Sequence, residues 1–511
     1  MAKSLMVVGT SSHVGKSILV TALCRIMRQD GFLVAPFKVQ NMSRNSAVTP
    51  EGLELSRAQA VQAEAAQTPV SVHMNPILLK PMNGHISQVV VQGRVHSHQA
   101  ALSYMHAEKG DLWRVATESY QYLAERYSVI VLEGAGSPVE MNLKAHDLTN
   151  MRAAKMADAA VLLVADIERG GVFASVIGTL DLLEPDERVR IAGIVINKFR
   201  GDPTLFDDGV RFLEEKTGIP VLGVMPYVPE IGIDEEDSLG LTSPRYQLSS
   251  ANGARIAIVP LPHLANFTDV DALFLETDMV PFFCRTPEDL AKADAVIIPG
   301  TKNTMEDLMW LKSRGWATAL EKVQRRGCPI LGICGGYQML GEVVCDPEGL
   351  ESMQSEVTGL GWLPMKTTLV SPKRTVWVKG RLVDAWGGHS VSGYEIHMGR
   401  SQSTGNVLPL AEVHSADDDT AHQEGFVTND GKIVGTYLHG ILDNPGFRDQ
   451  WLNQVRQAVG LAAPESNRSP VSMQDVREQA YDRLATMVRG HLQMDMVYHA
   501  MGIERHDPIL D

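Results

Sequence analysis

The feature that most constrains the fold is a glycine-rich stretch near the N-terminus, Gly9-Thr-Ser-Ser-His-Val-Gly-Lys-Ser17. It follows the apolar run Leu5–Val8 and precedes residues 18–27, where apolar side chains recur at helical spacing. A strand, a tight loop and a helix in this order aim backbone N–H groups and a helix N-terminus at one point, which suits a phosphate. The stretch therefore predicts a nucleotide-binding loop, and the alternative is a plain strand-to-helix turn.

Four residues of this loop are expected to contact ATP or its metal ion. The Lys16 ammonium would reach the β- and γ-phosphates of ATP, and the Ser17 hydroxyl would hold Mg²⁺. Five residues separate Gly9 from Gly15, one more than in the usual pattern. The expected ATP contacts within the loop are Thr10, Gly15, Lys16 and Ser17.

A carboxylate for the metal is expected at the end of another strand. The apolar run Val129–Leu132 leads into Glu133, which small residues follow. A magnesium–nucleotide site needs one or two carboxylates beside phosphate oxygens and water. We therefore expect Ser17 and Glu133 to be metal ligands, whereas the alternative makes Glu133 an ordinary acid at a strand end.

Apolar runs alternate with helical segments across residues 1–230, which predicts a doubly wound parallel sheet. Residues 159–165 and 191–196 are continuous apolar runs typical of central strands. The second run ends at Asn197 and Lys198, which we expect to bind ATP, with the Asn197 amide at the adenine edge. An asparagine in this position is also a common turn former.

A polar segment follows the expected strand Leu33–Phe37, at the sheet edge where open α/β sheets bind ligands. A solvated loop is the alternative on residue type alone. The residues expected to contact a substrate are Lys38, Gln40, Asn41, Ser43 and Asn45.

A second α/β domain is expected after the acidic, Gly- and Ser-bearing residues 230–252. Within it, the apolar run 329–333 leads into Cys334, flanked by glycines, and a helix follows at once. This strand-to-helix elbow presents a nucleophile above a sheet, and the helix N-terminus favours the thiolate and offers donors for an oxyanion. The best base is His439, which ends another apolar segment. The cysteines expected to be inert are Cys24, Cys284, Cys328 and Cys345.

Length, net charge and cysteine content indicate the number of domains, the partners and the cellular compartment. The 511 residues allow two or three domains, and the net charge of −15 makes a nucleic-acid groove unlikely. No apolar run approaches the roughly 20 residues that span a bilayer, and the N-terminus leaves no room for a signal peptide before the first strand. Five cysteines without scaffold spacing favour reduced thiols in a cytoplasm. The sequence defines no oligomeric state.

Three domain limits are expected: a nucleotide-binding domain over 1–232, a second α/β domain over 252–448 and a helical tail over 449–511. In the tail, residues 476, 480, 484 and 487 form one apolar face after a capping-type start at Ser472. We expect this tail to pack on the second domain and to carry no chemistry.

Together these stretches resemble the cobyric acid synthases, glutamine-dependent amidases of the cobalamin pathway, over nearly the whole chain. The first loop resembles that of dethiobiotin synthetase and its amidating relatives, and residues 332–338 and 437–440 resemble a class I glutamine amidotransferase domain. Further stretches resembling those of cobyric acid synthases are Ala35–Ser43, Ser56–Ala60, Met74–Pro81 and Ser87–Gly93.

The resemblance implies a reaction. Glutamine is hydrolysed at Cys334, and ammonia passes to the first domain. There, ATP with Mg²⁺ activates carboxylates b, d, e and g of adenosylcobyrinic acid a,c-diamide as acyl phosphates, which ammonia converts to amides. The residues that this reaction assigns to binding the oxyanion and glutamine are Gly300, Gly335 and Gln338. The polar segment is assigned to binding the corrinoid.

One departure from the resemblance concerns the histidine. Triad amidotransferases carry a glutamate two residues after it, whereas Gly440 and Ile441 follow His439 here. The sequence therefore predicts a Cys–His dyad with no assigned orienting group.

Three rival functions stay open at the level of sequence. A cobyrinic acid a,c-diamide synthase would carry an acidic residue after the second strand, where this chain has Gln40-Asn41-Met42-Ser43. A nucleotide-switch ATPase of the partitioning type would lack the cysteine elbow. A purely structural amidotransferase domain would lack glutaminase activity.

Overall fold

The computed structural model describes residues 2–81, 86–100, 110–228, 232–233, 247, 252–415, 421–463 and 472–504. Two compact units divide the chain. Unit 1 comprises Met1–Ser43, Leu55–Asp234 and Val476–Asp511, and unit 2 comprises Arg44–Glu54 and Glu235–Asp475. Each unit is therefore discontinuous in sequence. The linker predicted over 230–252 lies almost wholly outside the described residues.

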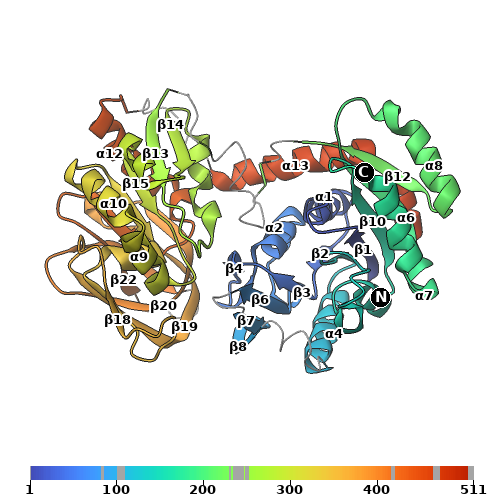
Figure 1. The fold of residues 1–511 in the computed structure, drawn as a ribbon, viewed down its shortest axis with the longest axis horizontal. Helices are drawn as coiled ribbons and strands as arrows, with labels where there is room; N and C mark the ends of the chain where they lie inside the picture. Colours follow the sequence, from blue (N-terminus) through green and yellow to red (C-terminus); the bar gives the residue numbers. More distant parts are fainter. Residues whose placement is uncertain are drawn as a thin grey trace. The chain divides into compact units, whose positions relative to one another are not determined.

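A six-stranded sheet forms the centre of unit 1 (Figure 1), in the order β12-β11-β10-β1-β9-β2. Every strand pair in it is parallel, which confirms the predicted doubly wound sheet. The register places Val7 of β1 opposite Glu133 of β9. The strands are β1 (Lys3–Gly9), β2 (Val34–Phe37), β9 (Val129–Glu133), β10 (Ala160–Asp166), β11 (Ile191–Phe199) and β12 (Val221–Pro226).

Helices cover both faces of this sheet because alternate strand residues point to opposite sides. One face packs against α4, α5, α6 and α8, and the other packs against α1, α2, α13 and α14. The helices of unit 1 are α1 (Lys16–Gln29), α2 (Arg57–Ala65), α4 (Gly110–Ala124), α5 (Met151–Met156), α6 (Val172–Leu182), α7 (Pro185–Arg188), α8 (Asp207–Thr217), α13 (Met473–His491) and α14 (Met494–Ala500).

The expectation that the C-terminal tail packs on the second domain is wrong for residues 476–504, whereas Trp451, Leu452 and Val455 at its start do lie in the core of unit 2. Helices α13 and α14 bury Tyr481, Leu484 and Val497 in the same core as Leu5 of β1. Arg25 of α1 pairs with Glu478 and Asp482 of α13, at 2.8 Å in each case. The amphipathic pattern predicted the helix, but an apolar face does not specify which of the two cores it packs against.

A small four-stranded sheet in the order β3-β6-β7-β8 also differs from expectation. The sequence of residues 98–126 favours a helix, but 98–100 close strand β8, 101–109 lie outside the described residues and helix α4 begins at Gly110. The polar segment after β2, for which a solvated loop was the alternative interpretation, contains β3, which pairs with β6 in parallel. The strands are β3 (Gln40–Met42), β6 (Ile77–Pro81), β7 (Ile86–Val91) and β8 (Arg94–Ala100), and β4 (Ser46–Val48) pairs with β5 (Glu54–Ser56).

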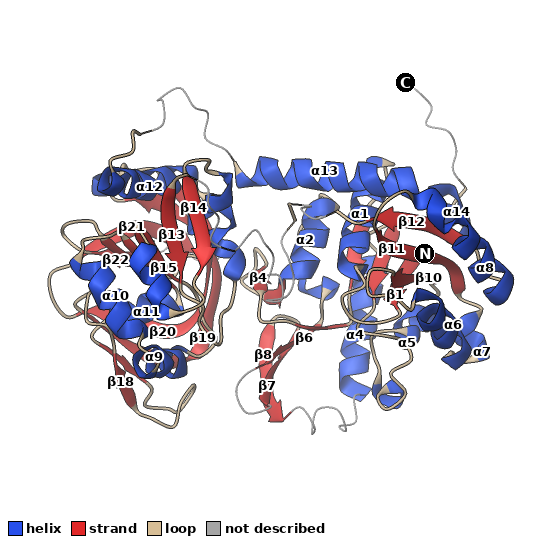
Figure 2. Ribbon diagram, turned by 45° about the horizontal axis from the view of Figure 1, so that its top comes forward, coloured by secondary structure: helices blue, strands red, loops and turns tan. Residues whose placement is uncertain are grey.

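Unit 2 contains an eleven-stranded mixed sheet in the order β14-β13-β15-β16-β23-β22-β21-β19-β17-β18, with β20 paired to β19 (Figure 2). Strands β14, β13, β15, β16 and β23 are parallel, and β22, β21, β19 and β20 continue as antiparallel strands. The strands are β13 (Ala254–Ile258), β14 (Met279–Phe283), β15 (Ala295–Ile298), β16 (Ile330–Ile333), β17 (Val343–Cys345), β18 (Glu356–Thr358), β19 (Met365–Leu382), β20 (Ser390–Ser403), β21 (Leu408–Ser415), β22 (Ala421–Val427) and β23 (Ile433–Thr436).

Helices α9, α10 and α11 pack on one face of the parallel strands, and α12 with the 3-10 helix η6 packs on the other. The sequence of residues 304–324 favours a single helix, but Gly315 in the left-handed region (φ 80°) separates α9 from α10. The helices of unit 2 are α9 (Thr304–Ser313), α10 (Trp316–Arg325), α11 (Gly335–Leu340) and α12 (Pro445–Val459). Among the residues that the structure describes, the 3-10 helices are η1 (Val72–Met74), η2 (Lys144–His146), η3 (Pro203–Phe206), η6 (Phe267–Leu275), η7 (Pro287–Lys292), η8 (Asp384–Trp386) and η9 (Ile441–Asp443).

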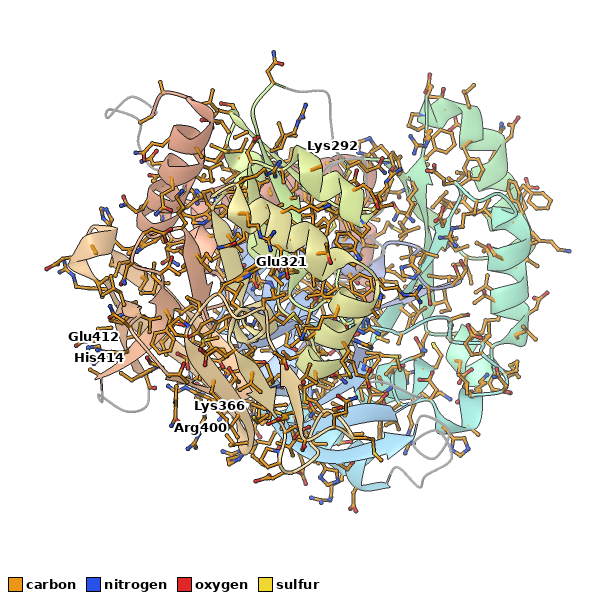
Figure 3. The ribbon with its side chains drawn as sticks, turned by 60° about the vertical axis from the view of Figure 1, so that its left-hand side comes forward. Lys292, Glu321, Lys366, Arg400, Glu412 and His414 are labelled. Carbon is orange, nitrogen blue, oxygen red and sulfur yellow. The ribbon has the colours of Figure 1, made fainter. Side chains whose placement is uncertain are left out.

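The antiparallel strands alternate between core and solvent. Charged side chains occupy their exposed positions, and Figure 3 labels Lys366, Arg400, Glu412 and His414 among them. The intervening residues, such as Met365 and Val413, are fully buried. This alternation is the pattern expected of a sheet with one solvated face. Among the described residues, no helix combines the length and apolar character required to cross a membrane.

Candidate active site

The glycine-rich loop has the geometry that its sequence predicts. Strand β1 ends at Gly9 and helix α1 begins at Lys16, with Gly15 as the N-cap at φ 100°. A Cβ atom at Gly15 would lie 2.1 Å from the Asn197 amide nitrogen, so both the backbone angle and the space demand glycine. The loop therefore presents its backbone at the carboxyl edge of the parallel sheet, where ligands bind.

Lys16 lies against this loop and is largely buried. Its Nζ atom donates to the Ser11 carbonyl oxygen at 3.0 Å and to the Gly136 carbonyl oxygen at 2.9 Å. The ammonium is thus held between the loop and the segment that follows β9. This position beside the loop is suitable for a phosphate contact.

Glu133 is the centre of a buried polar cluster. The Ser17 hydroxyl donates to its Oε1 atom at 2.9 Å, and Lys38 Nζ donates to the same oxygen at 2.7 Å. Gln62 Nε2 donates to Oε2 at 2.5 Å. The structure therefore brings together Ser17 and Glu133 as predicted. It also places Lys38, predicted as a substrate contact, on the Glu133 carboxylate.

Gln62 was missed by the sequence reasoning. It lies on α2, whose sequence is rich in alanine and glutamine, and it is fully buried. Two glutamines on one helix, Gln59 and Gln62, are both buried, although glutamine is usually exposed. Nothing in the spacing distinguished them from solvent-facing polar residues.

The donors around Glu133 fit Mg²⁺. One carboxylate and one hydroxyl oxygen lie within hydrogen-bond distance of each other, and hard oxygen donors are what this ion prefers. Within the described ranges, no group of three or more His, Cys, Asp or Glu side chains gathers as a metal cage. Such a cage is not required, because a nucleotide-bound Mg²⁺ takes most of its ligands from phosphate and water.

Asn197 and Lys198 brace the loop from β11. Asn197 Nδ2 donates to the Val14 carbonyl oxygen at 2.8 Å, and its Oδ1 accepts from the Lys198 backbone at 2.9 Å. Lys198 Nζ donates to the His13 carbonyl oxygen at 2.6 Å and to Asp166 Oδ2 at 2.9 Å. Both residues therefore lie at the loop, whereas their contact with ATP, and that of the Asn197 amide with adenine, stays a prediction. Thr10 is held through its backbone N–H, which donates to the Val164 carbonyl oxygen at 2.9 Å.

The polar segment after β2 is more buried than a substrate-binding loop would be. Asn41 Nδ2 donates to Ser56 Oγ at 2.6 Å and to Gln59 Oε1 at 3.1 Å. The Ser43 backbone N–H donates to the Leu79 carbonyl oxygen at 3.1 Å, as part of the small sheet. Gln40, the first residue of strand β3, is partly exposed. A corrinoid contact at these positions stays a prediction.

Asn45 belongs to unit 2 rather than to the nucleotide-binding unit. Its Oδ1 atom accepts from the Asn266 backbone N–H at 2.9 Å, and the Ser46 backbone N–H donates to Asn266 Oδ1 at 3.0 Å. The Trp377 indole N–H donates to the Val48 carbonyl oxygen. The short strand β4 is therefore part of the amidotransferase-like unit, although it comes from the N-terminal part of the chain.

Cys334 occupies the strand-to-helix elbow that the sequence predicts. Between β16 and α11 its backbone has φ 52° and ψ −109°, a strained conformation for a residue with a side chain. A Cβ at Gly332 would lie 2.9 Å from the Gly336 carbonyl carbon, and one at Gly336 would lie 1.9 Å from the Ile298 carbonyl oxygen. Glycine is therefore required on both sides for the elbow to close.

The predicted oxyanion residues surround the cysteine. A Cβ at Gly300 would lie 3.7 Å from Cys334 Cβ, and one at Gly335 would lie 3.2 Å from the Thr301 nitrogen. The Cys334 backbone N–H is bonded within the sheet, to the Thr436 carbonyl oxygen at 2.8 Å. Gly300 and Gly335 thus lie beside Cys334, and their contact with an oxyanion stays a prediction.

Gln338 projects from α11 into a polar pocket of buried side chains. Its Oε1 atom accepts from Thr304 Oγ1 at 2.7 Å, and its Nε2 atom donates to the Tyr437 hydroxyl at 3.3 Å. The assignment of Gln338 to glutamine stays a prediction. Thr304 and Tyr437 are further polar residues of the site that sequence reasoning missed.

His439 lies next to the cysteine, and a carboxylate holds its ring. A Cβ atom at Gly300 would lie 3.2 Å from His439 Cε1 and 3.7 Å from Cys334 Cβ, so the ring and the cysteine adjoin the same glycine. Asp269 Oδ2 lies 2.7 Å from His439 Nδ1. Burial disfavours the imidazolium, but the Asp269 carboxylate and Cys334 outweigh that effect and raise the pKa of His439 above its ordinary value. The group beside the imidazole that the sequence left unassigned is therefore Asp269, which lies 170 residues upstream.

The other cysteines lack this environment. Burial raises the pKa of Cys24 far above its ordinary value and that of Cys284 to about 12. Burial also raises the pKa of Cys328. All five cysteines are free thiols.

A cysteine elbow with a histidine, together with a nucleotide-binding loop in the same chain, defines the class of glutamine amidotransferases joined to a nucleotide-binding domain. Residues 255–447 match the CobB/CobQ-like glutamine amidotransferase domain, and residues 5–239 match the CobQ/CobB/MinD/ParA nucleotide binding domain.

Curated relatives narrow the class to one family. Cobyric acid synthase from Desulforamulus reducens is 45% identical over 99% of this chain and 100% of its own length. The cobyric acid synthases from Geobacillus thermodenitrificans and Klebsiella pneumoniae are 44% and 46% identical, covering 98% of this chain and 99% and 98% of their own lengths. The chain belongs to the cobyric acid synthase family, which confirms the resemblance seen in the sequence. It is a glutamine-dependent amide ligase of cobalamin biosynthesis.

Proposed function

We propose that the chain uses ATP, Mg²⁺ and L-glutamine to amidate carboxylates b, d, e and g of adenosylcobyrinic acid a,c-diamide, giving cobyric acid. The observation that carries this proposal is the presence of two complete chemical sites in one chain. One is the Cys334–His439 pair at an elbow, and the other is the Lys16 loop with Ser17 on Glu133. Nitrogen release and carboxylate activation require these two kinds of site.

In the amidotransferase unit, the Cys334 thiolate attacks the side-chain amide carbon of glutamine. The C–N bond breaks as His439 gives its proton to the departing ammonia, and a thioester of Cys334 remains. Water, deprotonated by the now neutral His439, hydrolyses the thioester to glutamate and restores the thiol. The backbone N–H groups at Gly335 and near Gly300 would stabilise the oxyanion.

In the nucleotide-binding unit, a corrinoid carboxylate oxygen attacks the γ-phosphorus of ATP, and ADP leaves. Ammonia then attacks the acyl phosphate, so that the amide forms and inorganic phosphate departs. Lys16 would bind the β- and γ-phosphates, with Thr10, Gly15, Asn197 and Lys198 forming or bracing the loop. Ser17 and Glu133 would hold Mg²⁺, which supplies positive charge against the phosphate oxygens.

The reaction is placed in the cytoplasm, since all five cysteines are free thiols, as in a reducing compartment. The partners are the two small substrates and ATP. The acidic net charge of −15 supports the absence of a nucleic-acid partner.

The test separates the two nitrogen sources. Cys334→Ser should abolish synthesis from glutamine and retain synthesis from ammonium salt, with mass spectrometry counting the amides formed on the a,c-diamide. Cys328→Ser is the matched control and should keep both activities. If the folded Cys334→Ser protein loses both activities, or keeps glutamine-dependent synthesis, the assignment of the cysteine is wrong. Amidation of positions a and c of cobyrinic acid instead would favour the a,c-diamide synthase alternative.

A further inference from the structure

His439 receives its carboxylate from a distant segment of unit 2. Asp269 lies on η6, and its Oδ2 atom is 2.7 Å from His439 Nδ1, while its Oδ1 atom accepts from the Gly440 backbone N–H at 3.0 Å. We propose that Asp269 is the positioning residue for His439, in the role that the glutamate two residues after the histidine has in triad amidotransferases. The inference rests on the proposed function of Cys334 and His439.

The hydrogen-bond geometry determines which ring nitrogen carries a proton. A carboxylate oxygen only accepts, so the proton of this bond belongs to Nδ1. The other nitrogen, Nε2, is then the one available to the thiol and to the leaving group. Because Oδ1 is held by the Gly440 N–H, the carboxylate cannot rotate away from the ring without losing a second bond. Asp269 therefore sets both the tautomer and the orientation of the imidazole.

Burial strengthens the interaction between the Asp269 carboxylate and the His439 imidazole. Asp269 and His439 expose only 6% and 1% of their surface, so their interaction is little screened by solvent. The other groups that face the imidazole are the Cys334 side chain, the Tyr394 ring stacked at 5.1 Å, and the neutral Asn266 amide at 3.4 Å from Nδ1. Of these, Asp269 is the one carboxylate among the described contacts of the ring. Its negative charge favours the imidazolium that protonates departing ammonia.

The start of η6 is itself held firmly. Asn266, its N-cap, has φ 52° in the left-handed region, which asparagine tolerates better than most residues. Its backbone N–H and its Oδ1 atom are both bonded to the segment at Asn45 and Ser46. The carboxylate is thus carried on a braced turn rather than on a free loop, as a positioning role requires.

The test is Asp269→Asn, which keeps size and removes charge. In asparagine, an N–H₂ group replaces one of the two carboxylate oxygens. That group would face either His439 Nδ1 or the Gly440 N–H, and it cannot accept a hydrogen bond from either. We expect the glutaminase kcat to fall about 10⁴-fold, the size of the loss when the carboxylate of a catalytic triad is replaced. The KM for glutamine should change little, and the high-pH limb of the kcat profile should move to lower pH as the imidazolium loses its partner.

Two controls separate positioning from folding. Asp271→Asn alters another buried acid of the same helix, about 120° away around a 3-10 axis with three residues per turn, and should leave the glutaminase pH profile unchanged. Synthesis from ammonium salt should persist in Asp269→Asn. If Asp269→Asn keeps the wild-type kcat and pH profile, or if Asp271→Asn reproduces its effect, the positioning role is refuted.

A measurement on the unsubstituted protein does not depend on how a variant folds. In ¹⁵N-histidine-labelled protein, the His439 resonances are identified by their absence from His439→Gln. We expect Nδ1 to remain protonated on both sides of the imidazole titration. A neutral form with the proton on Nε2 would overturn the inference. The proposed function fails separately, through the Cys334→Ser experiment, so the two failures can be told apart.

Discussion

Replacing Lys38 by methionine tests what this lysine does. Its Nζ atom lies 2.7 Å from Glu133 Oε1, and the side chains expose only 6% and 1% of their surface. Lys38→Met keeps the length of the side chain but removes the ammonium. Glu133 would then keep the Ser17 and Gln62 hydrogen bonds while its negative charge stays buried without this partner.

The expected cost follows from the burial of the pair. Removing one partner of a buried ion pair costs about 3–5 kcal/mol, because the remaining charge is uncompensated. Hydrogen exchange of the β9 peptide measures this loss locally. At 1.4 kcal/mol for each tenfold change, exchange there should accelerate roughly 10²- to 4 × 10³-fold. Lys198→Met is the matched control. The Lys198 side chain is partly exposed in its ion pair with Asp166, so the loss of this pair should cost about 1 kcal/mol or less.

A double variant isolates the electrostatic cause. Lys38→Met with Glu133→Gln leaves no buried charge in this pair, so the β9 peptide should recover most of its protection from exchange. Ligase activity should not recover, since the proposed metal ligand is lost. If Lys38→Met leaves exchange at β9 unchanged and raises only the KM for the corrinoid, the lysine contacts substrate and the reasoning from the ion pair is refuted.

Lys16→Ala should lower ligase turnover about 10²–10³-fold with either glutamine or ammonium salt, and near-normal ammonium-dependent turnover would contradict its phosphate role. A glutamine-mimicking electrophile at neutral pH should label Cys334 alone, more slowly in His439→Asn. Peptide mapping that finds Cys284 or Cys345 equally modified would refute the dyad. Gly336→Ala should destabilise unit 2 by about 1–3 kcal/mol in thermal unfolding, because its Cβ would lie 1.9 Å from the Ile298 carbonyl oxygen. Gly178→Ala, on α6 with no atom within 4 Å of the added Cβ, is its control and should be neutral or stabilising.

The two reactive elements could be predicted because their signals are local. The Gly9–Ser17 loop and the Cys334 elbow each need a strand, a turn with demanding backbone angles and a helix within about a dozen residues. Glu133 could be predicted beside Ser17 because neighbouring parallel strands end at the same edge of a sheet, and β1 does pair with β9. Fold class and family followed from these stretches together.

The partners of those elements were decided only by tertiary structure. The predicted contact of Lys38 with a substrate stays a prediction, and only the tertiary structure shows that its Nζ atom donates to Glu133. The tail was predicted to join the second domain, yet Tyr481 packs with the first, since an amphipathic face does not specify which core covers it. Asp269 had no signal at all. A carboxylate 170 residues from its histidine leaves no spacing to recognise, and only the packing of η6 against the sheet brings the two side chains to 2.7 Å.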